Sequence, residues 1–440
     1  MSSSSGTTHI DSIFAQVTSA PNTTAVHQIF KAATSRDSQD SLFASFLSDG
    51  QDPLPLLDPR IHGLALLYFL SARLNANFSN VPPPPWQVIQ DFCKYFDPKQ
   101  AQLAPEHVTK LANGINRLAR YIGNLSLAVP PLFDLVSRYP LSPSHLTTIH
   151  PVFLLTCVST RHFLTALPIL EHPITEIDTK FCPDLTYTDN LVYHYTGGVA
   201  LAALKKWKDA EEHFEICVTS PGTYPAALQM EALKKLRLVQ LIARGTVPPL
   251  PKYTHPQLVR LFKNTPYNAF INAYPRNGPL MREIFDKERQ TFSQEKNVGL
   301  LQQAIARAPR WVLKKLTATY VTLHLGDIAR AVSIESEDEV RALLLSMIEA
   351  NDITAQISAS GTVTFSDPPA QFTKAQVDGV LRNAQSQTSL LAYLELEMSR
   401  SKEYLNKVVK TNDSTWAPSA EEEIFANLGG QHMWEENIYS

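Results

Sequence analysis

The chain has 440 residues, 44% of them hydrophobic, and a formal net charge of −3. This length suffices for two or three domains with their own cores, and the near-neutral charge argues against general affinity for nucleic acid or membrane surfaces. Cys93, Cys157, Cys182 and Cys217 lie at least 25 residues apart without a Cys-x-x-Cys spacing. They are therefore expected to be reduced, buried thiols of a cytoplasmic and nuclear protein.

Helical periodicity dominates residues 10–243. Residues 1–9 have neither the charged start nor the apolar centre of a signal peptide, and a disordered terminus is expected. No segment reaches the ~20 apolar residues that cross a bilayer, and the longest apolar run, 64–70, precedes Arg73 and predicts a core helix. We therefore predict a mainly α protein that begins with an α-solenoid. The periodic segments are 25–33, 41–47, 60–74, 86–96, 106–121, 130–138, 150–160 and 163–170.

Residues 193–217 resemble one tetratricopeptide repeat. Gly198, Ala210 and Cys217 stand where that motif has small residues, and Phe214 stands at its aromatic position. Small residues let two antiparallel helices approach closely, while the aromatic ring fills the space between their turns. The match predicts a helical pair inside the solenoid.

Two oppositely charged segments follow the proline-rich break at 247–251. Residues 244–315 contain thirteen Lys or Arg and four acidic residues, a net charge of +9. Residues 316–440 contain eight basic and eighteen acidic residues, a net charge of −10. The chain is nearly neutral because these charges cancel, and the role of the basic segment stays open.

Residues 313–367 predict a winged helix made of three short helices and a hairpin. Helices are expected at 313–323 and 326–332, and a capping box of Ser336 and Glu339 opens the third. The third helix has an apolar stripe at helical spacing. Its members are Val340, Leu343, Leu344, Met347 and Ile348.

Alternation with a period of two predicts the hairpin. One strand covers 353–358, residues 359–361 turn the chain, and the second strand covers 362–366. We expect the second strand to be the outer one, with free backbone groups that pair with a partner protein. The predicted partner-binding positions of the two strands are Ile353, Ala355, Ile357, Thr362, Thr364 and Ser366.

The charge of this module disfavours DNA. Winged helices that read DNA need Lys and Arg against the phosphates. Residues 310–368 contain five basic and eight acidic residues, a net charge of −3. The module is therefore expected to dock on proteins.

Residues 373–410 predict one long helix of roughly 55 Å at 1.5 Å per residue. Its apolar residues recur every seven positions, and the winged helix is too small to cover such a stripe, so a bundle with partner helices is expected. An acidic tail, 411–440, follows with six acidic residues and no Lys or Arg. The predicted partner-binding positions of the helix are Val377, Leu381, Leu391, Leu394, Met398, Leu405 and Val408.

No sequence motif for catalysis is present. The chain lacks HExxH, GxSxG, the phosphate-binding GxxxxGK[ST] and GxGxxG. A protein without catalytic residues, cofactor, metal or small-molecule substrate is therefore expected.

Three segments, 316–329, 347–353 and 362–369, resemble the PCI-domain proteins. These proteins are scaffold subunits of the proteasome lid, the COP-nine signalosome and a translation initiation factor, and the likeness is greatest to the signalosome members. It implies a PCI domain over 191–369, with the winged helix as its end. It also implies that winged helices associate edge to edge and that the terminal helices form one bundle.

By this resemblance the chain is a non-catalytic scaffold, with other signalosome subunits as partners, in a complex that removes the ubiquitin-like modifier Nedd from cullin-RING ligases. Two alternatives remain open. One is a scaffold subunit of another PCI complex. The other is a nucleic-acid-binding winged-helix protein that uses the basic segment 244–315.

Overall fold

The computed structural model describes residues 10–33, 39–366 and 372–406. It divides into two compact units, 1–364 and 365–440, and each is described by itself. The predicted disordered terminus 1–9 and the acidic tail 411–440 lie outside the described residues. The expected mainly α architecture, with helical repeats followed by a winged helix, is confirmed.

Helices make up almost all of the first unit. They are, in chain order, α1 (Ile10–Ser19), α2 (Thr23–Ala32), α3 (Gln39–Phe43), η1 (Leu54–Leu56), α4 (Gly63–Asn75), α5 (Trp86–Tyr95), α6 (Pro98–Ala101), α7 (Pro105–Ile122), η2 (Leu125–Ala128), α8 (Val129–Arg138), α9 (Ile149–Thr160), α10 (Phe163–Leu170), α11 (Tyr187–Ala203), α12 (Trp207–Thr219), α13 (Ala227–Arg244), α14 (Pro256–Phe262), α15 (Pro266–Ala273), α16 (Gly278–Lys287), α17 (Arg289–Gln294), α18 (Val298–Thr317), α19 (Leu325–Val332) and α20 (Glu337–Glu349). The strands are β1 (Thr322–His324), β2 (Thr354–Ile357) and β3 (Thr362–Ser366), and the second unit contains α21 (Lys374–Arg400).

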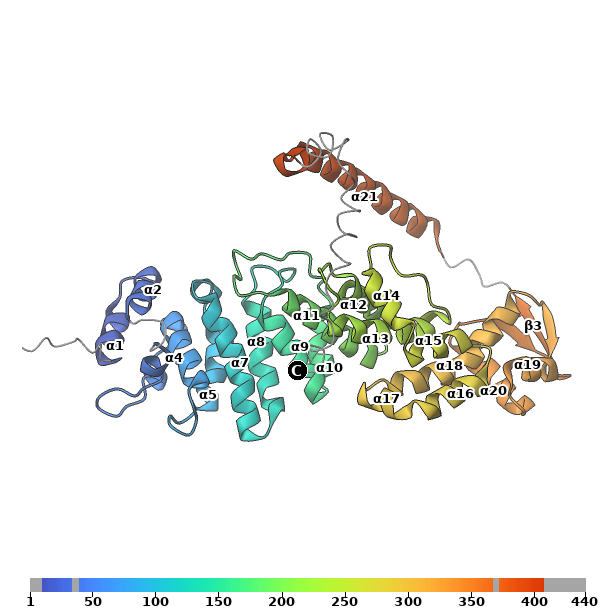
Figure 1. Cartoon of the computed structure of the whole chain (residues 1–440), viewed down its shortest axis with the longest axis horizontal. Coiled ribbons are helices and arrows are strands. Elements are labelled where there is room, and N and C mark those ends of the chain that lie inside the picture. Colours follow the sequence, from blue (N-terminus) through green and yellow to red (C-terminus); the bar gives the residue numbers. More distant parts are fainter. Residues whose placement is uncertain (1–9, 34–38, 367–371, 407–440) are drawn as a thin grey trace, which may run out of the picture. The chain divides into compact units, whose positions relative to one another are not determined.

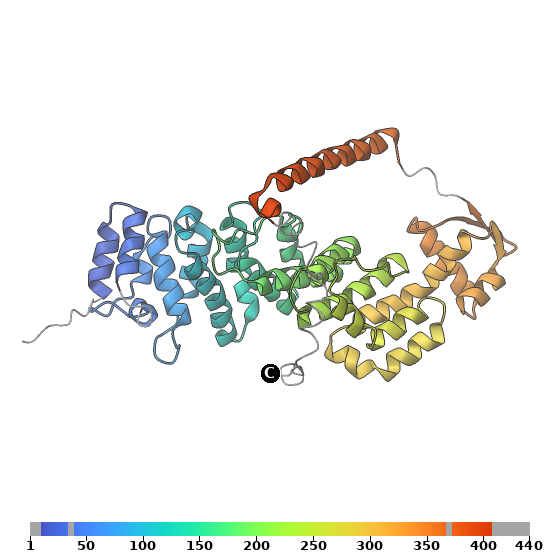
Figure 2. The same cartoon turned by 45° about the horizontal axis from the view of Figure 1, so that its top comes forward.

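Successive helices stack on one another along the chain. Helix α4 packs on α7, α5 on α8, and both α7 and α8 on α9, which then packs on α11. Figures 1 and 2 show these helices side by side in this order. Contacts between helices close in sequence are the construction principle of solenoids, in which each repeat buries its apolar face on the next.

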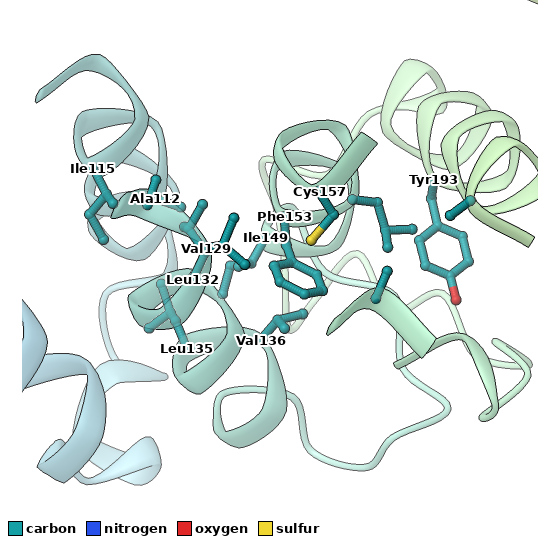
Figure 3. Close-up of a cluster of buried hydrophobic side chains, with 14 of the residues drawn as sticks. Ala112, Ile115, Val129, Leu132, Leu135, Val136, Ile149, Phe153, Cys157 and Tyr193 are labelled. Atoms are coloured by element: carbon teal, nitrogen blue, oxygen red, sulfur yellow. The ribbon is translucent and has the colours of Figure 1, made fainter. Parts of the chain in front are cut away.

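One apolar layer of this stack lies between α7, α8, α9 and α11 (Figure 3). Leu132 of α8 and Phe153 of α9 are fully buried at its centre. Cys157 lies beside them as a buried free thiol, and the other three cysteines are also buried and free, as predicted. The apolar run 64–70 is likewise buried within α4.

Helices α11 and α12 confirm the tetratricopeptide-like pair. A Cβ atom built on Gly198 would lie 2.8 Å from the ring of Phe214, and Phe214 is completely buried. Residue 198 must therefore be glycine for the two helices to approach this closely.

A buried polar network fastens α13 to the helices that follow it. Lys234 Nζ lies 2.6 Å from carboxylate oxygens of both Glu231 and Glu295. Tyr267 donates its hydroxyl proton to the second oxygen of Glu295 at 2.6 Å, and Lys235 Nζ donates to Asn297 Oδ1 at 2.6 Å. The network therefore joins α13, α15 and the turn between α17 and α18.

Burial and hydrogen bonding act in opposite directions on the two lysines. Burial lowers the pKa of Lys234, but hydrogen bonds to Glu231 and Glu295 outweigh this, and its pKa is raised. Burial dominates at Lys235 and lowers its pKa to about 8. Each ammonium group keeps hydrogen-bond acceptors, which is the condition under which a buried charge is tolerated.

We predict that Gly198→Ala destabilises the solenoid although alanine is the better helix former. The added methyl group costs about 1–3 kcal/mol as overpacking, which exceeds the gain of up to ~1 kcal/mol in helix propensity. Gly299→Ala in α18 is the matched control, because nothing lies within 4 Å of its added Cβ. Thermal unfolding should show a lower melting temperature for Gly198→Ala only; equal melting temperatures would contradict the tight helix contact.

Candidate assembly surfaces

The winged helix is built from α18, α19, α20 and the three-stranded sheet. His324 caps α19 by accepting a hydrogen bond from Gly326 N, and Ser336 caps α20 by accepting one from Glu339 N at 3.4 Å. The predicted second and third helices are thus confirmed, together with the serine half of the predicted capping box.

The predicted apolar stripe of α20 faces the core of this module. Val340, Leu344 and Met347 are buried, whereas Leu343 and Ile348 are half-buried. Helix α19 contributes a second apolar face to the same small module. Its buried residues are Leu325, Ile328, Ala329 and Val332.

The first predicted helix was wrong at both ends. We expected a helix over 313–323, but α18 begins at Val298 and ends at Thr317, and residues 322–324 form β1. The segment before and within β1 is rich in β-branched and aromatic residues, which favour strands, and β1 pairs antiparallel with β3. Strand pairing therefore overrides the helical periodicity that continues past Thr317.

The expected outer strand lies in the middle of the sheet. The strand order is β1-β3-β2, and Thr322 pairs with Thr364 in the register of β1 and β3. Thr362 is half-buried, and the side chains of Thr364 and Ser366 are exposed on the sheet face. The expected edge is wrong because the helical periodicity of residues 313–323 hides β1, and without β1 the strand β3 has one neighbour only.

Strand β2 is therefore one edge of the sheet. Ser358 N donates to Thr362 O at 2.8 Å, which fixes the side of β2 that faces β3. Backbone groups of an antiparallel strand alternate in direction, so those of Ala355 and Ile357 point away from β3, toward the open edge. The side chains of both residues are half-buried, and Ile353 just before the strand is buried. At Ala355 and Ile357 the groups that face the open edge are therefore backbone N–H and C=O groups, not side chains.

The helix that would enter a DNA groove has an acidic, exposed start. Glu337, Asp338 and Glu339 form the first turn of α20, and all three side chains are exposed. Carboxylates at this position stabilise the helix through its dipole. The same charges repel a phosphate backbone, so the sequence-based argument against DNA holds for the folded surface.

Helix α21 is shorter than predicted. It begins with a capping box of Thr373 and Gln376, as a helix start at residue 373 implies, but it ends at Arg400. Ser401 adopts an extended conformation and accepts a hydrogen bond from Tyr404 N at 3.2 Å, which starts a new helical turn at 402–406. Leu405 thus lies beyond the break, and Val408 lies outside the described residues.

Among the described residues of its own unit, nothing covers the large apolar side chains of α21. Val377, Leu381, Leu391, Leu394 and Met398 are all exposed to 45% or more. Four further apolar residues of α21 are exposed: Val380, Leu390, Tyr393 and Leu396. Sequence periodicity missed the last three because they lie off the heptad. The second half of α21 is therefore apolar on nearly all sides, a pattern typical of helices surrounded by other helices.

Known proteins resemble the chain over most of its length. The family model "COP9 signalosome complex subunit 3, N-terminal helical repeats" matches residues 25–259, and the model "PCI domain" matches residues 281–367. The chain belongs to the COP9 signalosome subunit 3 family. The PCI match covers the winged helix, and the helical-repeat match runs from within α2 to within α14.

Curated relatives with the name "COP9 signalosome complex subunit 3" come from three distant organisms. The Dictyostelium discoideum protein is 30% identical, and the match covers 81% of this chain and 87% of the relative. The Drosophila melanogaster protein is 27% identical, and the match covers 85% of this chain and 89% of the relative. The Arabidopsis thaliana protein is 29% identical, and the match covers 87% of this chain and 89% of the relative. Each of these three matches thus covers more than four-fifths of this chain.

The chain's titratable groups do not assemble into a metal site within the described residues: no three His, Cys, Asp or Glu side chains are arranged to hold an ion. No helix among these residues combines the length and apolarity needed to cross a membrane.

Three histidines are instead part of the packing of the helical repeats: His150 and His194 are buried, and His213 is half-buried. His150 Nδ1 accepts a hydrogen bond from Thr147 N at 3.1 Å, and the rings of His194 and His213 lie 5.3 Å apart. Burial lowers the pKa of His150 and His213 to about 4, and burial together with His213 lowers that of His194 to about 3. These imidazoles are neutral core residues at neutral pH.

We predict that acid destabilises the helical repeats in a defined range. Between pH 6.5 and about 4 the unfolded chain binds more protons than the folded chain, because the folded-state pKa values are depressed. Stability is therefore full above pH 6.5 and declines as the pH falls. One histidine with such a shift contributes roughly 3 kcal/mol.

Urea unfolding at several pH values measures this decline. His194→Phe should reduce the slope of unfolding free energy against pH. Substitution of the exposed His162 by Gln should retain the slope, because His150, His194 and His213 all remain. An equal slope in wild type and His194→Phe would contradict the assignment.

Proposed function

We propose that this protein is a non-catalytic scaffold subunit of a COP9 signalosome, located in the cytoplasm and nucleus. The observation that carries the proposal is the similarity of more than four-fifths of the chain to relatives with that subunit's name. The signalosome's reaction, removal of the modifier Nedd from cullin-RING ligases, then belongs to the complex. The role of this chain is to hold other subunits in place.

Two exposed elements support a scaffold role. Among the residues that the structure describes, none pairs with the outer backbone edge of β2, and such edges in soluble proteins are usually paired or covered. Helix α21 exposes large apolar residues along its length. Edge pairing and helix bundling are two ways to bury these groups, and each requires protein partners.

The nucleic-acid alternative has weaker support. Its basis is the basic segment 244–315, but the exposed first turn of α20 is acidic. Another PCI complex is disfavoured because the helical-repeat match is specific to subunit 3.

We predict that Ala355→Pro weakens assembly through the β2 edge. Proline removes the N–H group of residue 355, which points away from β3, so the sheet itself keeps its pairing. Losing a backbone hydrogen bond to a partner strand should lower affinity about tenfold. Purification of the tagged chain from cells, followed by native mass spectrometry of the recovered subunits, measures the effect.

Ala355→Val is the matched control, because it keeps the N–H group and favours strand geometry. Thermal unfolding of both variants checks that the winged helix remains folded. Wild-type recovery of all subunits by folded Ala355→Pro would exclude this edge as an interface.

We further predict that Leu391→Asp with Met398→Asp disrupts helix bundling. Both positions belong to the exposed apolar stripe of α21. Burying two carboxylates should cost several kcal/mol of association free energy, a loss of a hundredfold or more in affinity. The melting temperature of the isolated chain should hardly change, since neither side chain is buried in it.

Ser386→Asp with Ser389→Asp supplies the control on the opposite side of α21. It adds the same charge at two positions that are already polar in the wild-type helix. A stripe variant that still joins the complex like the control, or one whose isolated chain unfolds, would refute the assembly role of the helix.

A further inference from the structure

We propose that a basic groove walled by Trp311, where the solenoid meets the winged helix, binds an acidic peptide segment of another protein. The groove has a volume of about 410 Å³. Its lining comes from the end of α13 and the second half of α18. The lining residues are Ala243, Arg244, Gly245, Trp311, Lys314, Lys315 and Ala318.

The backbone next to Trp311 is shaped around its indole ring. Gly245 ends α13 with a φ of +71°, and a Cβ atom there would lie 2.5 Å from the ring. The ring is therefore fixed against the glycine, and one wall of the groove is rigid and apolar. Lys314 Nζ lies 5.5 Å from the centre of the same ring, within reach of a cation–π contact.

The cations around the groove are only partly neutralised. Arg244 pairs with Glu211 at 2.9 Å, and Arg310 in the adjoining hollow pairs with Asp352 at 3.4 Å. Lys314 and Lys315 are exposed, and no carboxylate among the described residues pairs with either. Two free ammonium groups thus border an aromatic wall.

This combination suits a peptide better than a nucleic acid. Glu or Asp side chains can pair with the two lysines, while an aliphatic or aromatic side chain between them packs on the indole. A nucleic acid is bound through cations that follow several successive phosphates, whereas this groove offers two free lysines beside an apolar ring. We therefore assign the groove to an acidic segment that includes an apolar residue.

The full-length chain and a fluorescein-labelled probe peptide, Glu-Glu-Leu-Phe-Glu-Glu, test the assignment by fluorescence anisotropy. We expect saturable binding that weakens with salt, since ion pairs at an exposed site are screened. Lys314→Glu with Lys315→Glu should reduce affinity at least tenfold. A probe with Ala in place of Leu and Phe should also bind more weakly.

The control variant is Arg260→Glu with Lys263→Glu, which changes the net charge of the chain equally. Both residues are exposed, belong to the same basic segment and do not line the groove. Melting temperatures of the two variants establish that both are folded.

Three results would overturn the proposal. They are absence of saturable binding, equal losses in the groove and control variants, and displacement of the probe by single-stranded RNA at concentrations below those of unlabelled peptide. None of these bears on β2 or α21, so the proposed scaffold function would stand.

Discussion

The half-buried contacts of Glu295 join the helical repeats to the helices that lead into the winged helix. Its carboxylate binds Lys234 of α13 and Tyr267 of α15, and the turn that contains it leads directly into α18. Helix α18 is then the first helix of the winged helix. The buried Lys234 and Lys235 need these hydrogen-bond partners, so the network favours one arrangement of these helices. The walls of the groove beside Trp311 belong to α13 and α18, so the same arrangement positions them.

The sequence predicted most helices because their periodicity is local. Leu64 through Leu70 and the pair around Gly198 needed no information from elsewhere in the chain. The sheet was harder, because β1 has three residues and its identity depends on pairing with β3, about 40 residues later. Missing β1 led directly to the wrong edge strand. The burial of Lys234 and Lys235 could not be predicted either, because two consecutive lysines ordinarily indicate a solvated helix face.

The predicted assembly positions also divide into those that local periodicity reveals and those that depend on the folded structure. The exposed apolar stripe of α21 follows from heptad spacing, but the break at Ser401 depends on a serine cap that competes with helix continuation. Tyr393 and Leu396 lie off the heptad. Their exposure in the structure shows that apolar side chains lie on nearly all sides of α21. The solenoid is well packed, whereas β2 has an open backbone edge and α21 exposes apolar side chains. These features suit a chain that holds partner proteins.

Hydrogen exchange of the isolated chain, compared with the chain inside the purified signalosome, tests this account most directly. The amides of Ala355 and Ile357 and those of residues 374–400 should exchange quickly in the isolated chain and slowly in the complex, because partners cover both elements. The amides of α13, buried in either state, should exchange equally. Unchanged exchange in both β2 and α21 would contradict assembly through these elements.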